Sequence, residues 1–159
     1  MAGSLAVAAL NAVSGLIGAW VWYRGDLVAG TSTDHGADGG AVRAFWVLLR
    51  VGQGSALTLA IAVGSLAAAG NYSTEHLFYL YALLPLAIAF VAEQLRVASA
   101  QTILDQRGLE NAAAVGALPE SEQQIVVLMI VRREIGVMAL SALVVVFLAL
   151  RAASTAHGF

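Results

Sequence analysis

The strongest constraint on this chain is a series of long apolar stretches, each close to the length needed to cross a lipid bilayer. A hydrocarbon core of about 30 Å requires about 20 mostly apolar residues in a helix. Residues 4–23 carry no charge, and three comparable stretches follow. Because 60% of the 159 residues are hydrophobic and only 11% are charged, the chain is more apolar than a soluble domain. These features predict an all-α integral membrane protein.

The predicted architecture is a single four-helix transmembrane domain spanning residues 1–159. The expected crossings lie at about 4–23, 44–69, 75–95 and 135–151. The glycine-rich segment 25–42 lacks helical periodicity and is predicted to be a flexible loop, and a tight polar turn begins at Gly70.

Stop signals predict that the third and fourth helices are longer than a bilayer is thick. No break follows Glu93, and Gly108 is the first residue suited to end the third helix, so this helix should continue to Arg107. Pro119, followed by acidic residues, is typical of a helix start, and the fourth helix should run to Ala153. Residues 96–134 are therefore expected to form an antiparallel cytoplasmic hairpin.

The distribution of arginine predicts the orientation. All eight basic residues are arginine, and most fall in the two connections that share one side when the N-terminus is outside. The chain should then be a multi-pass protein of a bacterial cytoplasmic (inner) membrane with both termini extracytoplasmic. The arginine-only, alanine-rich composition indicates a GC-rich bacterial genome. The first arginine, Arg24, follows the first apolar stretch, which argues against a cleaved signal peptide.

Arg50 is the residue that most needs an explanation, because a charge inside a crossing segment is costly unless it is paired or reaches the interface. One interpretation is that its long side chain extends to the inner head groups. The other is an ion pair between helices, for which Glu93 is the acid expected at matching depth. Gln53 follows Arg50 by three residues, so it shares the same helix face and could join the contact.

The charged triplet at 132–134 interrupts the apolar sequence of the fourth helix. If the crossing starts at Ile135, these charges lie at the inner surface, and we expect Arg133 and Glu134 to join Arg50, Gln53 and Glu93 in one polar cluster. Residues 125–131 then become an apolar cytoplasmic patch, which should face the segment 97–104 or a partner protein. The side chains expected to face a partner are Ile125, Leu128 and Met129.

A second candidate site lies at the start of the third helix. His76, Tyr79 and Tyr81 could border a quinone or haem pocket, although aromatic residues at an interface are ordinarily an anchoring belt. Asp34, His35 and Asp38 could ligate a metal, but a glycine-rich loop would hold them poorly. No metal site and no cofactor are therefore predicted.

Small residues predict close helix packing rather than chemistry. The expected pairs are Ser14/Gly18, Gly15/Ala19 and Gly54/Thr58, and Asn11 and Ser14 are expected to bond across helices. Pro85 removes a backbone donor in the middle of the third helix and predicts a structural bend.

The sequence gives no positive support for catalysis. It has no cysteine, no phosphate-binding loop, no zinc-ligand spacing and no nucleophile elbow. The net charge of −2 provides no basic stripe for nucleic acid. The leading hypothesis is a non-catalytic accessory or assembly subunit of a larger, possibly respiratory or energy-converting, membrane complex. Its partners would be the lipid bilayer and other membrane subunits or further copies of itself. The alternatives are a small transporter or channel with a polar path at Arg50, Gln53 and Glu93, and a quinone- or haem-binding protein near His76.

Overall fold

The computed structural model describes residues 1–24, 37–70 and 76–155, and these ranges contain helices and no strand. Four of the helices are long. They are α1 (Ala2–Tyr23), α3 (Ala37–Ala68), α4 (His76–Gln106) and α6 (Glu120–Thr155), and the short α5 (Ala112–Gly116) lies between the last two. In the described part of the chain, each of the four long helices is long and apolar enough to cross a membrane.

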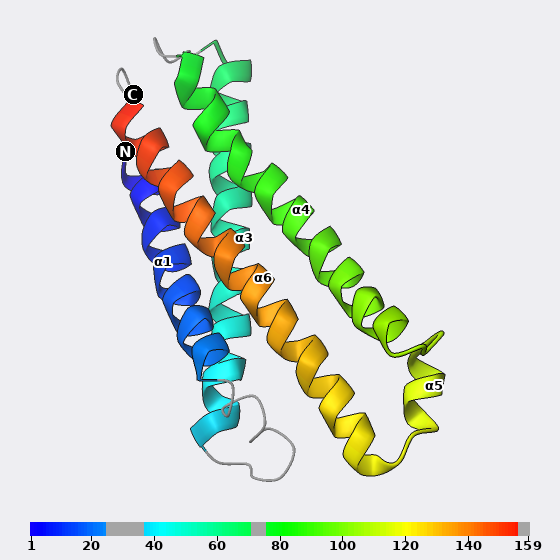
Figure 1. Cartoon of the computed structure of the whole chain (residues 1–159). Coiled ribbons are helices and arrows are strands. Elements are labelled where there is room, and N and C mark those ends of the chain that lie inside the picture. The colour runs from blue at the N-terminus through cyan, green and yellow to red at the C-terminus, as the bar shows by residue number, and fades with distance from the viewer. Residues whose placement is uncertain (25–36, 71–75, 156–159) are drawn as a thin grey trace.

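The last helix, α6, is the common packing partner of the long helices. It packs extensively along both α1 and α4, whereas α3 packs mainly against α1 and touches α4 over a shorter length. The start of α1 and the end of α6 lie at the same end of the molecule, and α5 lies at the other (Figure 1). Toward α5, α4 and the beginning of α6 diverge from α1 and α3 (Figure 1).

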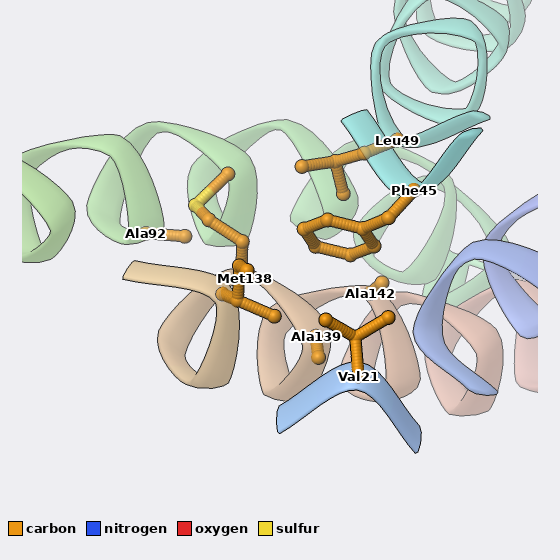
Figure 2. Close-up of a cluster of buried hydrophobic side chains, with 8 residues drawn as sticks. Val21, Phe45, Leu49, Ala92, Met138, Ala139 and Ala142 are labelled. Carbon is orange, nitrogen blue, oxygen red and sulfur yellow. The ribbon is translucent and has the colours of Figure 1, made fainter. Parts of the chain in front are cut away.

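A buried apolar cluster joins all four long helices. Phe45 and Leu49 of α3 point toward α6, and Val21 of α1 approaches the same place from the other side (Figure 2). Gly18 makes this approach possible, because a Cβ there would lie 2.4 Å from the Phe45 ring and 2.8 Å from the Ala139 methyl group. The cluster comprises Val21, Phe45, Leu49, Ala92, Ile135, Met138, Ala139 and Ala142.

The helix ends confirm that α4 and α6 are long. With 31 and 36 residues, they measure about 46 Å and about 54 Å at 1.5 Å per residue. The α4 helix ends as expected: Gly108 has φ +67°, and the Leu109 N–H donates to the Leu104 carbonyl. This pattern is a Schellman motif. The Pro119 carbonyl accepts from the Gln123 N–H at 3.0 Å, so α6 starts within one residue of the predicted position.

One feature of the connections was predicted incorrectly. Residues 37–42 belong to α3 rather than to a loop, because Ala41 and Val42 pack against the central apolar cluster. That packing overrides the low helix propensity of glycine. Residues 34 and 35 lie outside the described ranges. The connection after Gly108 contains α5, whose first turn is capped by the Asn111 side chain accepting from the Ala114 N–H at 3.0 Å.

The predicted small-residue contacts are present in α1 and absent at Gly54. A Cβ on Gly15 would lie 2.9 Å from the Leu143 side chain. In contrast, nothing lies within 4 Å of a Cβ on Gly54, and the Thr58 hydroxyl only donates to the Gly54 carbonyl of its own helix. The close approach in α3 occurs instead at Gly52, whose Cβ would lie 3.0 Å from the Asn11 amide.

The predicted bonds across helices from Asn11 and Ser14 are also absent. The Asn11 amide donates to the Val7 carbonyl of its own helix at 2.9 Å, and the buried Ser14 hydroxyl has no hydrogen-bond partner in the described part of the chain. Both side chains are small, and this allows α1 to pack closely against its neighbouring helices. Pro85 is buried inside α4, which continues on both sides of it.

Candidate functional site

The polar centre of the molecule is the contact between Arg50 of α3 and Glu93 of α4. The Arg50 Nη1 donates to the Glu93 Oε1 at 2.5 Å and to the Gln53 Oε1 at 2.8 Å. The Gln53 amide nitrogen also lies 3.4 Å from the Glu93 Oε1. Spacing of three residues brings Arg50 and Gln53 onto one face of α3, as expected. Arg50 is therefore paired between helices.

A second arginine extends this contact to α6. The Arg96 Nε donates to the Glu93 Oε2 at 3.0 Å, and Arg96 Nη1 lies 3.9 Å from the Glu134 Oε2. The Arg96 guanidinium also lies over the Trp46 ring, 5.6 Å from its centroid. The electrons on the face of an aromatic ring attract such a cation. Arg96 had not been assigned to the cluster from the sequence, although it follows Glu93 by one helical turn.

The observed network thus contains two arginines and two carboxylates from three helices. Each carboxylate faces a guanidinium, so the charges compensate one another where the helices meet. Within a bilayer or at its surface, paired charges cost far less than separate ones. This arrangement can hold α3, α4 and α6 in a fixed register, and no carboxylate in it lacks a basic neighbour.

Arg133 is not part of this network, contrary to the prediction. Consecutive residues on a helix point about 100° apart, so when Glu134 faces Arg96, Arg133 is directed elsewhere. It lines two depressions beside α6, together with Trp22 of α1. Arg133 is next to Glu134 along α6, but its side chain lies on a different face of the helix from the polar network.

A shallow groove of about 300 Å³ lies next to the polar network, between α3 and α4. Gln53 and Glu93 form its polar part, and the remaining lining is mostly apolar and includes Leu57, Leu86 and Phe90. The groove therefore provides polar groups at one place along its wall rather than a continuous polar path.

The second predicted site comprises His76, Tyr79 and Tyr81, which lie in the first turns of α4. His76 is exposed at the start of α4, and the Tyr81 ring lies 5.5 Å from the Arg151 guanidinium of α6. Tyr79 packs edge-on to Phe78. None of these residues lines either of the two depressions beside α6. In the ranges that the structure describes, no group of three or more potential metal ligands is present.

The predicted partner-facing residues differ in exposure, because one of them packs inside the bundle. Leu128 is half-buried against the central cluster, whereas Ile125 and Met129 are exposed. The Met129 sulfur accepts from the Arg107 Nη2 at 3.3 Å. Val126 is buried with Ile103 and Leu104, so the expected contact between the two arms of the hairpin is present.

Comparison of the chain with protein-family models, curated proteins and solved structures gave no match.

Proposed function

We propose that this chain is a multi-pass membrane protein and acts as a non-catalytic accessory or assembly subunit of a larger membrane complex. Its four long apolar helices form one bundle, with the polar network at the inner boundary of the bilayer. The positions of the arginines favour two extracytoplasmic termini, and the arginine-only, alanine-rich composition favours a bacterial inner membrane. The paired charges fix the bundle and leave the surface free for partners.

The observation that carries this proposal is the apolar surface of the α4–α6 hairpin. Val97 is 64% exposed, Ile125 48% and Val127 50%. Because α4 and α6 are longer than a bilayer is thick, we expect these residues to lie outside the span in the proposed topology. Exposed apolar groups in water are typical of protein interaction sites. A second membrane subunit that covers this part of the hairpin would remove them from water.

The test is purification in mild detergent followed by native mass measurement. We expect a stoichiometric second polypeptide with the natural chain and its loss with the double variant Ile125→Glu/Val127→Glu. Gln124→Glu is the control, because it adds one negative charge to the same exposed turn without replacing an apolar side chain. Recovery of the lone chain from native membranes would contradict an accessory role.

The groove beside Glu93 favours a second candidate, a small transporter or channel. Arg50, Gln53 and Glu93 would then contact the solute, and an additional chain would have to complete the path. Liposomes containing the purified protein provide the test: solute flux above that of empty vesicles, abolished by Glu93→Gln, would support transport. Flux equal to that of empty vesicles would contradict it.

A further inference from the structure

Two depressions beside α6 are adjacent, as shown by Trp22 and Arg133, which line both. The larger has a volume of about 450 Å³ and runs between α1 and α6. The smaller, of about 270 Å³, lies where the ends of α1 and α4 approach α6. Together they form what we call the α6 groove. Its lining residues are Ala19, Trp22, Ile103, Gln106, Met129, Arg132, Arg133, Gly136, Val137, Ala139, Leu140 and Leu143.

The larger part of the α6 groove is apolar apart from Arg133. Ala19 leaves room on the α1 side, and Leu140 and Leu143 form the α6 side. Gly136 brings the Trp22 indole against α6, because a Cβ there would lie 2.8 Å from the indole nitrogen. A narrow apolar surface of this kind suits a flexible hydrocarbon chain, and its volume lies within the range of about 300–1,000 Å³ typical of small-ligand sites.

The smaller part of the α6 groove is basic. Arg132 and Arg133 line it, and Arg107 lies next to it through its contact with the Met129 sulfur. Among the residues that the structure describes, no acidic residue lines either part. The Arg132 guanidinium lies over the Trp22 ring, 5.8 Å from its centroid. Arg133 is exposed and makes no ion pair in the part of the chain that the structure describes. The described lining of the groove therefore combines positive charge with an apolar surface.

We propose that the α6 groove binds an anionic phospholipid, with one acyl chain along Leu140 and Leu143 and the phosphate between Arg132 and Arg133. This inference rests on the proposed membrane location, in which Trp22 and the two arginines lie at the inner head-group level, where tryptophan is enriched. Guanidinium groups bind phosphate through paired hydrogen bonds. The charge complementarity favours an anionic head group over a zwitterionic one.

Trp22 provides a direct measurement of lipid binding. The variant Trp20→Phe/Trp46→Phe leaves Trp22 as the only tryptophan of the chain. It is reconstituted into phosphatidylcholine vesicles with increasing fractions of phosphatidylglycerol brominated on its acyl chains, and in parallel with brominated phosphatidylcholine. Bromine quenches tryptophan fluorescence at contact. We expect half-maximal quenching of Trp22 at a lower fraction of the brominated anionic lipid.

Arg133→Gln then tests the head-group contact. Because an arginine near an anionic lipid surface contributes about 1 kcal/mol, the anionic lipid fraction at half-maximal quenching should rise about five-fold. Arg43→Gln is the matched control, since Arg43 is an exposed arginine of α3 that lines neither part of the α6 groove, and it should leave this fraction unchanged.

The other outcomes separate the lipid site from the proposed function. Equal quenching by the two brominated lipids would show insertion without selectivity and would overturn the lipid site alone. Absence of quenching by either lipid would overturn the membrane location, and the proposed function with it. If the two brominated lipids quench equally, while inorganic phosphate changes the Trp22 emission and chloride at the same ionic strength does not, the arginines bind a free anion and the lipid proposal is wrong.

Discussion

At the scale of single residues, Glu93 has the most connected side chain of the polar network. One of its carboxylate oxygens accepts from Arg50, and the other accepts from Arg96. Loss of Arg50 still leaves Glu93 paired with Arg96, whereas loss of the carboxylate leaves two guanidinium groups facing each other. Removing a shared counter-charge is more destabilising than removing one of two partners.

We expect Glu93→Gln to lower the free energy of unfolding by about 1–2 kcal/mol more than Arg50→Gln does. The Arg50 side chain is 52% exposed, so the coupling between the two residues should be modest, about 0.5–1 kcal/mol. Reversible unfolding in mixed detergent micelles, with both single variants and the double variant, measures both values. A coupling free energy of zero would show that the contact between Arg50 and Glu93 has no energetic role.

Replacing Gly18 and replacing Gly54 by alanine should have opposite effects on the free energy of unfolding, although both glycines lie within helices. Gly18→Ala would place a methyl group against Phe45 and Ala139, so we expect a loss of about 1–3 kcal/mol from overpacking. Gly54→Ala has open space around the new methyl group and should be neutral or stabilising by up to about 1 kcal/mol, because alanine favours the helix. The same unfolding measurement compares them. Equal effects would contradict the packing role of Gly18.

At the scale of elements, the sequence allowed prediction wherever local chemistry determines the outcome. The continuation of α4 past Glu93 followed from the absence of any breaker, and its end followed from Gly108, which takes a backbone conformation that other residues rarely adopt. The contact of Arg50 with Glu93 was one of the two interpretations that the sequence left open, and it was based on matching depth and on the cost of an unpaired charge.

Features that depend on tertiary packing could not be predicted in this way. The early start of α3 depends on Ala41 and Val42 contacting a cluster built by other helices. Similarly, the choice of Gly52 rather than Gly54 as the contact glycine depends on the rotation of α3 about its axis. Arg133 was assigned to the polar network because its position along α6 could be inferred from the sequence, whereas the rotation of α6 about its axis could not. The α6 groove is formed by three helices, so no single stretch of sequence indicates it.

The turn after α4 gives a prediction at the element scale. Gly108→Ala should destabilise the Schellman motif by about 1–2 kcal/mol, because a Cβ is disfavoured at φ +67°. We expect faster protease cleavage between α4 and α6, as the end of α4 opens more often. Gly116→Ala is the control, since Gly116 has no positive φ and its Cβ would meet nothing within 4 Å. Equal cleavage of the two variants would contradict this role for Gly108.

At the scale of the whole molecule, the proposed topology can be tested without removing native thiols, because the chain has no cysteine. Glu110→Cys lies on the exposed connection after α4, and Ser154→Cys lies at the end of α6. In intact cells, a membrane-impermeant maleimide should label Ser154→Cys and spare Glu110→Cys. Permeabilised cells should give labelling of both. The reverse pattern would show that the orientation inferred from the arginines is wrong.

The position of α6 in the chain has a consequence for biosynthesis. The N-terminal helices of a protein emerge first from the ribosome, yet α1 and α4 both have their most extensive contacts with the last helix. Until α6 is made, Gly15 of α1 lacks the Leu143 side chain against which it packs, and Arg96 lacks Glu134. In the nascent chain, α1, α3 and α4 therefore remain incompletely packed until α6 is synthesised. If translation ended before Glu120, the resulting fragment would expose these surfaces and would be a substrate for quality-control proteases.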